Sequence, residues 1–245
     1  MIHCLEFMMR AHKSSHITLL LAILLGTSAC IRTVTDPVTL CGIPRETSSD
    51  PLQHDPILFV HGYGESPDFF CPMIDRFRAA GWGERELYAY NYSFVLSHAA
   101  DAAEIRQQVD MILSQTHATK VDIIAHSAGS VSSRYYLKNL GGASKVDAWV
   151  SLAGPNHGTD TALNCSFTPC LEIRIGSQFL ADLNAGDETP GFPRYATWRS
   201  PCDETINPDE SVILDGATNH QSVCIAHGQF LTDPVIFQQV RDWIL

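Results

Sequence analysis

The sequence predicts a single α/β domain with a mostly parallel central sheet and helices on both faces. Short, continuous apolar runs alternate along the chain with longer segments that carry apolar residues at helical spacing. Continuous apolar runs are typical of strands buried on both faces, and strands that alternate with helices form parallel sheets. The roughly 215 residues that follow an N-terminal targeting segment are enough for one core. We find no linker and no repeat that would divide them.

The first half of the predicted domain supplies two strands and two helices. Residues 56–60 are apolar without interruption, and the glycine-containing stretch 61–64 ends the run, so we expect a buried strand and a turn. Residues 68–80 have helical apolar spacing and stop at a glycine. Residues 87–90 form a second short apolar run. Residues 99–115 carry an apolar stripe on one side only, which predicts an amphipathic helix.

The second half repeats the alternation. Residues 121–125 are a third apolar run, and the helical segment 128–140 ends at two glycines, which are common helix stops. A fourth strand is expected at 146–152 and a closing helix at 235–244. Segment 155–200 has weak periodicity, so we expect mostly loop there, with a short strand at Tyr195–Trp198.

The first 29 residues have the three parts of a secretory signal. Basic residues precede a short apolar run at 17–25, and small residues follow it up to Ala29. The run is too short to span a ~30 Å hydrocarbon layer as a stable helix. Two outcomes stay open, because cleavage after Ala29 would release a secreted protein, whereas a lipid on Cys30 would anchor it to the bacterial envelope. In both cases we expect export.

The remainder divides into an N-terminal extension at 30–53 and the α/β domain at 54–245. The net charge of the whole chain is −11, and no cluster of Lys and Arg follows the signal. Nucleic-acid binders need clustered cations, so no nucleic-acid partner is expected. We expect a monomer whose only membrane contact would be a lipid on Cys30.

Six cysteines follow Cys30, an even number that suggests disulfides in an exported chain. Proximity favours Cys165–Cys170, and Cys41–Cys71 and Cys202–Cys224 then follow by elimination. A zinc site is the rival interpretation. Because no closely spaced cysteine pair is matched by a second pair of Cys or His, we expect no metal.

The stretch Ala125-His126-Ser127-Ala128-Gly129 is the strongest catalytic signal. It lies between an apolar strand and a helix, where the nucleophile elbow G-x-S-x-G places a reactive serine, with Ala replacing the first Gly. Small residues on either side permit the tight turn. A serine that merely caps a helix is the alternative.

A serine that attacks an acyl group needs N–H donors for the oxyanion of the tetrahedral intermediate. The residue after the nucleophile supplies one, here Ala128. The loop after an early strand supplies the other, and Tyr63 lies there between two glycines.

The acid and the base should follow the serine in that order. Asp203 comes just after the strand at Tyr195–Trp198, with Glu204, Asp209 and Asp215 as rivals. His227 immediately precedes the last helix and is favoured as the base. His220 lies in a polar stretch and is expected to be a solvated loop residue. His157 precedes the acid, so we expect a structural role for it, and His61 and His126 are expected to shape the site.

These motifs resemble the small bacterial class 2 triacylglycerol lipases over roughly residues 54–245. The resemblance rests on five stretches, namely Val60-His61-Gly62, residues 120–127, residues 135–140, residues 154–159, and the run 200–208 that contains Pro201-Cys202-Asp203. It implies an α/β-hydrolase fold, and the chain is too short for a large cap domain as well. It also implies Ser127 as nucleophile, Asp203 as acid, His227 as base, and Tyr63 and Ala128 as oxyanion donors. Many relatives have Met where this chain has Ala128, but the donor is the backbone N–H.

The predicted function is hydrolysis of carboxylic esters, either lipids or small esters, through an acyl-enzyme and without a cofactor. The acyl-chain length stays open. The alternatives are an acyltransferase or a polyester depolymerase that uses the same triad, and a hydrolase fold that binds without catalysis.

Overall fold

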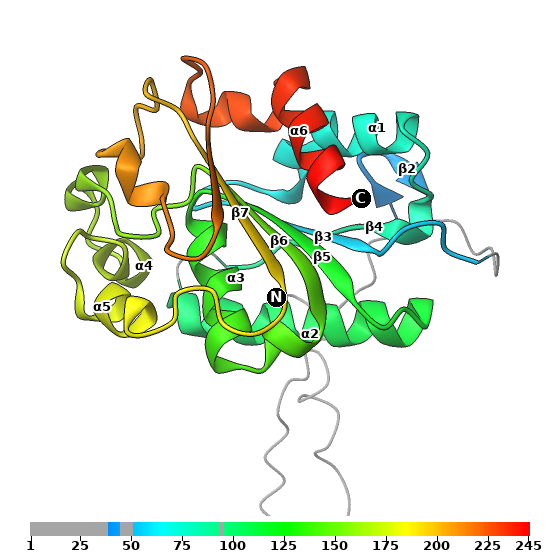
Figure 1. The fold of residues 1–245 in the computed structure, drawn as a ribbon, viewed down its shortest axis with the longest axis horizontal. Coiled ribbons are helices and arrows are strands. Elements are labelled where there is room, and N and C mark those ends of the chain that lie inside the picture. Colours follow the sequence, from blue (N-terminus) through cyan, green and yellow to red (C-terminus); the bar gives the residue numbers. More distant parts are fainter. Residues whose placement is uncertain (1–38, 45–50, 94–95) are drawn as a thin grey trace, which may run out of the picture. The chain divides into compact units, whose positions relative to one another are not determined.

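A parallel six-stranded sheet forms the centre of the protein in the computed structural model, which describes residues 39–44, 51–93 and 96–245 (Figure 1). Every pair of neighbouring strands is parallel. The parallel sheet and the strands predicted at 56–60, 87–90, 121–125, 146–152 and 195–198 are confirmed. In spatial order the strands are β4 (Leu87–Ala89), β3 (Ile57–Val60), β5 (Val121–His126), β6 (Val146–Leu152), β7 (Arg194–Arg199) and β8 (Thr218–Gln221).

Four helices cover the two faces of this sheet, as the sequence predicts (Figure 1). The helices α1 (Cys71–Ala79) and α6 (Pro234–Ile244) pack on one face, whereas α2 (His98–Thr116) and α3 (Ala128–Asn139) pack on the other. Side chains fix two of the helix starts. Ser97 accepts a hydrogen bond from the N–H of Ala100 at the start of α2, and Asp233 accepts from two N–H groups at the start of α6.

The apolar runs of the strands are continuous because each strand contributes to two cores. In β3, Ile57 and Phe59 belong to the core beneath α1 and α6, while Leu58 and Val60 belong to the core beneath α2 and α3. All four side chains are at most 1% exposed. Alternate side chains of a strand point to opposite faces, so a strand covered on both faces needs no polar positions.

Two features of the second half differ from the prediction. Segment 155–200 was expected to be mostly loop, but it contains α4 (Thr168–Glu172), α5 (Gln178–Asn184) and a 3₁₀ helix at Asp160–Asn164. These helices are too short for the 3.6-residue spacing of apolar side chains to be recognised in the sequence. Pro169 near the start of α4 and the Ser177 cap of α5 favour them locally.

The strand β8 was also missed, because its residues Thr218–Gln221 are polar and mostly exposed at the sheet edge. His220 lies on this strand. Its ring stacks on the buried Trp198 with centroids 4.3 Å apart. The expectation that His220 is a solvated loop residue was therefore wrong.

Three disulfides link the described cysteines in the pairing predicted, Cys41–Cys71, Cys165–Cys170 and Cys202–Cys224. The first one connects the small antiparallel pair β1 (Thr39–Leu40) and β2 (Ile43–Pro44) to the start of α1. Leu40 is 3% exposed and belongs to the core under α1 and α6. The predicted signal at 1–29 and Cys30 lie outside the described residues.

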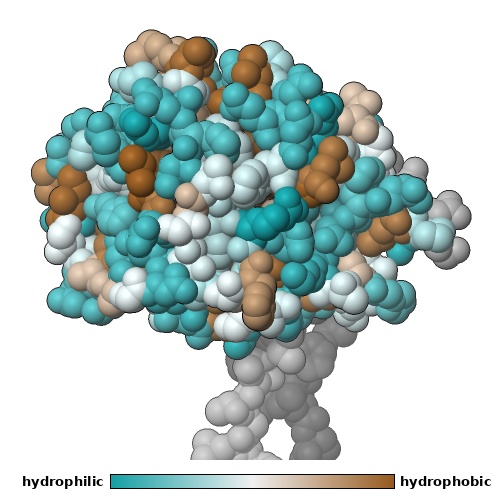
Figure 2. All heavy atoms as spheres, in the orientation of Figure 1, coloured by the Kyte–Doolittle hydropathy of each residue, from teal (hydrophilic) through white to brown (hydrophobic). Residues whose placement is uncertain are grey.

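The surface in Figure 2 is largely hydrophilic, with apolar side chains in separate spots. Scattered apolar residues of this kind are normal on a protein surface. Within the described part of the chain, we find no helix with the length and hydrophobicity needed to cross a lipid bilayer.

Candidate active site

The candidate residues follow three strands at one edge of the sheet. Because the strands are parallel, their carboxyl ends share this edge, and the loops after β3, β5 and β7 meet there. Tyr63 follows β3, Ser127 follows β5, and Asp203 follows β7. His227 begins the 3₁₀ turn that precedes α6.

Ser127 has the backbone of a nucleophile elbow. Its φ is 53° and its ψ −132°, a conformation that residues with a side chain rarely adopt. Gly129 explains the small residues of the motif, because a Cβ there would lie 2.4 Å from the main-chain oxygen of His61 and 2.6 Å from that of Val60. Ala128 opens α3, so the positive end of the helix lies beside the serine.

Asp203 and His227 form a hydrogen-bonded pair. The Nδ1 of His227 lies 2.9 Å from Oδ2 of Asp203, whose side chain is 1% exposed. The other carboxylate oxygen accepts hydrogen bonds from the N–H groups of Thr205 and Ile206 at 2.8 and 2.9 Å. Burial alone would raise the pKa of Asp203. The hydrogen bond and charge of His227 and these N–H groups outweigh burial, so the pKa lies below its usual value of 3.8. The carboxylate is therefore ionised and orients the imidazole.

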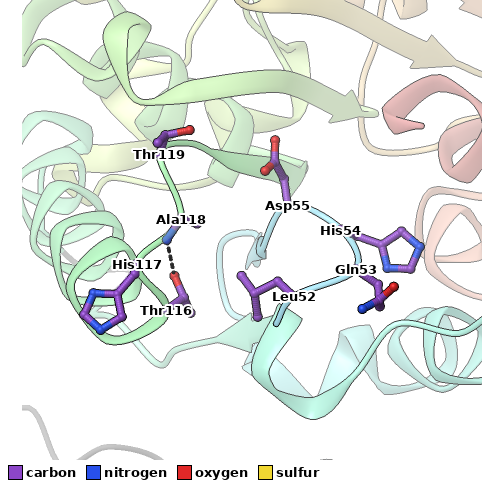
Figure 3. A pocket seen from close by; sticks show the side chains of 8 residues that line it. All are labelled: Leu52, Gln53, His54, Asp55, Thr116, His117, Ala118 and Thr119. Carbon is purple, nitrogen blue, oxygen red and sulfur yellow. Dashed lines mark hydrogen bonds between the residues drawn. The ribbon is translucent and has the colours of Figure 1, made fainter. Parts of the chain in front are cut away.

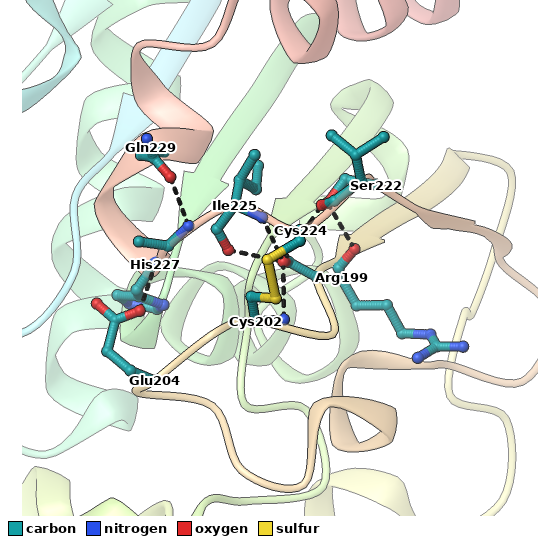
Figure 4. The surroundings of a disulfide bond; sticks show 11 residues. Arg199, Cys202, Glu204, Ser222, Cys224, Ile225, His227 and Gln229 are labelled. Atoms are coloured by element: carbon teal, nitrogen blue, oxygen red, sulfur yellow. Dashed lines mark hydrogen bonds between the residues drawn. A yellow bond between two sulfur atoms is a disulfide. The ribbon is translucent and has the colours of Figure 1, made fainter.

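The loops that carry this pair are joined next to it (Figure 4). The disulfide Cys202–Cys224 connects them, and the hydroxyl of Ser200 bonds both the N–H and the carbonyl of Ile225, at 3.0 and 2.6 Å. Glu204, which the sequence offered as a rival acid, accepts a hydrogen bond of 3.0 Å from the main-chain N–H of His227. Its contact is with the backbone of His227, whereas Asp203 contacts the ring.

His126 connects the loop of His227 to the serine turn. The Nε2 of His126 lies 3.1 Å from the main-chain oxygen of His227, and the two rings have centroids 4.6 Å apart. Since His126 directly precedes Ser127, the loop of His227 packs against the turn of Ser127.

The first loop also reaches the serine. A Cβ on Gly62 would lie 2.7 Å from Cβ of Ser127, so the backbone that leads into Tyr63 passes directly over it. Tyr63 is partly buried and packs with Ala128 in one apolar cluster, built mainly from α3, α5 and the loop between β6 and α4. The two predicted oxyanion donors therefore lie on neighbouring segments beside Ser127.

Two residues at this site were not singled out for the roles that their contacts indicate. Glu65 accepts a hydrogen bond of 2.7 Å from the N–H of Gly62 and contacts His126. Glu204 holds the backbone of His227. Only the contact between Gly62 and Glu65 left a signal in the sequence, namely a three-residue spacing that is typical of a turn. The contacts of Glu65 with His126 and of Glu204 with His227 join residues that are far apart in the chain.

The remaining candidates make other contacts. His157 hydrogen-bonds Glu188 at 2.9 Å, as expected of a structural histidine. Asp209 pairs with Arg199, and Asp215 is exposed. The buried ring of His61 stacks on Tyr92.

Three carboxylates at the amino ends of β3, β5 and β6 lie close enough together to hold a metal ion, among the residues that the structure describes. Oxygens of Asp55, Asp122 and Asp147 lie within 4.8 Å of one another. Asp147 already pairs with Lys120 and Arg194, and Asp122 accepts the N–H of Ala148. Asp147 and Asp122 therefore already have partners within the protein.

Asp55 also lines an open pocket at the amino ends of β3 and β5 (Figure 3), together with residues 52–54 and 116–119. Asp55 lies at the amino ends of the strands, whereas Ser127 lies at their carboxyl ends. Asp55 therefore takes no part in the site described above.

A family model described as "Lipase (class 2)" matches residues 54–233. Among solved structures, the mature form of the lipase BlEst2 from Bacillus licheniformis resembles the chain with a TM-score of 0.68 and 16% identity. The match covers 80% of this chain and 96% of that one. Lipase B from Aspergillus fumigatus gives a TM-score of 0.66 and 15% identity, over 75% of this chain and 51% of that one. The chain thus spans about half of the Aspergillus protein. Identities this low establish the shared α/β-hydrolase fold alone.

Proposed function

Since the chain belongs to the class 2 lipase family, we propose that it hydrolyses carboxylic esters with Ser127 as nucleophile, His227 as base and Asp203 as acid. The hydrogen bond between His227 and Asp203, 2.9 Å long and beside the strained turn of Ser127, is the observation that carries the proposal. Its substrates are lipids or smaller esters.

In the acylation step, Nε2 of His227 takes the proton of the Ser127 hydroxyl while the oxygen attacks the ester carbonyl. The carbonyl electrons move to the oxygen, and the N–H groups of Tyr63 and Ala128 stabilise the resulting oxyanion. The tetrahedral intermediate collapses, the proton passes from His227 to the departing alcohol, and an acyl-serine remains. Asp203 stays ionised throughout and stabilises the imidazolium.

Deacylation repeats the sequence with water. His227 takes a proton from the water that attacks the acyl-serine, and the same donors hold the second oxyanion. The carboxylic acid leaves, and the proton returns to Ser127. The net reaction consumes one water for each ester bond and uses no cofactor.

The three disulfides support export to an oxidising compartment. We propose residues 1–29 as the secretory signal, with either free secretion or a lipid on Cys30 as the outcome. Mass spectrometry of the mature N-terminus distinguishes the two, because only the anchored form carries a lipid on Cys30.

The test is hydrolysis of p-nitrophenyl esters of increasing chain length by the purified protein and by Ser127→Ala. Ser144→Ala is the matched control, because Ser144 is an exposed serine whose hydroxyl only bonds the main-chain oxygen of Gly141. A loss of roughly 10³-fold or more in kcat is expected in Ser127→Ala, with an unchanged circular dichroism spectrum and Tm. The control should match the unmodified protein.

A fluorophosphonate probe adds an independent readout, because it labels activated serines covalently. The unmodified protein and Ser144→Ala should take the label, whereas Ser127→Ala should not. Equal hydrolysis by all three proteins, or none by any of them, would contradict the serine mechanism. The preferred chain length then assigns the enzyme to short esters or to lipids.

A further inference from the structure

A second acid–histidine pair lies beside Ser127 and has no part in the proton transfers described above. The Nδ1 of His126 is 2.9 Å from Oε1 of Glu65. The His126 side chain is fully buried, and that of Glu65 is 13% exposed. Glu65 comes from the loop after β3, and His126 is the last residue of β5. A partly buried carboxylate next to a fully buried imidazole is favoured when the two are paired, because burying an unpaired charge is costly.

Both ring nitrogens of His126 face groups that only accept hydrogen bonds. At Nδ1 the partner is the carboxylate of Glu65, and at Nε2 it is the main-chain oxygen of His227 at 3.1 Å. A neutral imidazole has one N–H donor and one bare acceptor nitrogen, so it satisfies only one of these contacts. An imidazolium donates at both nitrogens and satisfies both. His126 thus bridges the carboxylate of Glu65 and the main chain of His227.

The carboxylate of Glu65 also holds the loop that carries Tyr63. Its Oε2 accepts the N–H of Gly62 at 2.7 Å, and the main-chain N–H of Glu65 returns to the oxygen of Gly62 at 3.3 Å. Burial raises the pKa of this carboxyl, but the hydrogen bond and charge of His126 and the N–H of Gly62 lower it more, so the carboxyl is ionised.

We propose that Glu65 and His126 are positioning residues, a hydrogen-bonded pair that holds the oxyanion loop at Gly62–Tyr63 and the base loop at His227 in fixed positions on either side of Ser127. The contacts run without a gap from the N–H of Gly62 through Glu65 and His126 to the main chain of His227. Glu204 holds the same stretch of backbone through the N–H of His227. The proposal rests on the ester-hydrolase function proposed above, since it assigns these loops their catalytic roles.

The bridge is tested first on the unmodified protein by ¹⁵N NMR of labelled histidines. A ring N–H that is buried and hydrogen-bonded exchanges slowly with solvent, so His126 is expected to show a slowly exchanging ring proton, and its signals are assigned by their loss in His126→Asn. A His126 ring whose protons all exchange rapidly would overturn the proposal, even if no variant folds.

The positioning role is tested with two substitutions of Glu65. Glu65→Ala removes the contacts to both Gly62 and His126. Glu65→Gln has an oxygen that can accept from Gly62 and an NH₂ that can donate to Nδ1 of a neutral His126, which still donates from Nε2 to His227. Since the contacts matter most when the oxyanion forms, Glu65→Ala is expected to lower kcat by about 10²-fold with little change in KM. Glu65→Gln should recover kcat to within about 10-fold of the unmodified protein.

Glu86→Ala is the matched control. Glu86 is also buried, also contacts an imidazole, Nδ1 of His54 at 3.1 Å, and also accepts a loop N–H, that of Gly83 at 2.9 Å. Glu86 directly precedes β4, so it lies at the amino ends of the strands, away from Ser127. Its loss should lower Tm without lowering kcat, which separates a general loss of stability from a loss of positioning.

Unchanged kcat in Glu65→Ala, or a Glu65→Gln variant as impaired as Glu65→Ala, would overturn the proposal. A loss of kcat in Glu86→Ala equal to that in Glu65→Ala would do the same. The result that would contradict the proposed function is a different one, namely ester hydrolysis that persists in Ser127→Ala.

Discussion

Removal of the Cys202–Cys224 disulfide should lower stability and activity together. The bridge has a sequence separation of 22. Cross-linking restricts the unfolded chain by an entropy that grows with the logarithm of loop length, which for this separation amounts to about 3.4 kcal/mol at 25 °C. In a domain of this size each kcal/mol shifts Tm by ~2–4 °C, so Cys202→Ser/Cys224→Ser should lower Tm by roughly 7–14 °C.

The expected loss of activity follows from where the bridge lies. Asp203 is the next residue after Cys202, and His227 is three residues after Cys224. The hydrogen bonds of Ser200 to Ile225 remain in the variant and keep the loops close. A catalytic group displaced by ~1 Å can lose ~10²-fold in rate, so with this partial support we expect kcat to fall by about 3–10-fold at 25 °C.

The assay combines thermal unfolding by circular dichroism with p-nitrophenyl butyrate hydrolysis. Cys41→Ser/Cys71→Ser is the control, because its bridge has a separation of 30 and a comparable stabilisation of about 3.6 kcal/mol, but joins the β1–β2 pair to α1 and does not tie the loops of Asp203 and His227. Both variants should melt earlier, and only the first should lose kcat well below its Tm. Equal kcat losses in both variants, or full kcat in both, would refute the reasoning.

Three further predictions concern single side chains. Gly129→Ala would place a Cβ 2.4 Å from the main-chain oxygen of His61, so it should destabilise the fold by about 1–3 kcal/mol in urea unfolding; a midpoint equal to that of the unmodified protein would contradict this packing. Asp203→Asn should lower kcat by ~10⁴-fold with little change in KM, because an amide does not hold His227 in the required tautomer; steady-state kinetics near the original kcat would point to another acid. Burial raises the pKa of Asp122 to about 8 from its usual 3.8, so the folded state binds a proton that the unfolded chain releases, and stability falls as pH rises from about 4 to 8. Asp122→Asn should remove this pH dependence and raise Tm increasingly towards pH 8, and parallel Tm curves for the two proteins would argue against it.

The parts of the fold predicted from sequence are those in which local pattern and burial agree. The strands β3, β5 and β6 are apolar on both faces because both faces are covered, and α2 shows its single buried stripe clearly. The elbow at Ser127 was also predictable, because a tight turn between a strand and a helix restricts its neighbours to small residues.

The parts that were missed depend on contacts made only after folding. The helices α4 and α5 have five and seven residues, too few for a hydrophobic period to emerge; α5 packs on α3, and α4 contacts α5 and the 3₁₀ helix at Asp160–Asn164. Glu65 and His126 are 61 residues apart in sequence, and nothing in either neighbourhood indicates that they meet. Pairings of this kind follow from the order of the strands, which local propensity does not determine.

The polar strand β8 affects how molecules of this protein meet one another. An open sheet edge exposes unpaired backbone groups that can pair with another chain and start aggregation. Here the last strand has four residues, Thr218–Gln221, all of them polar and all at least partly exposed. A short hydrophilic border of this type gives a second molecule little apolar surface to bury on docking. The polar residues of β8, which give no strand signal in the sequence, should thus protect the protein against edge-to-edge association at high concentration.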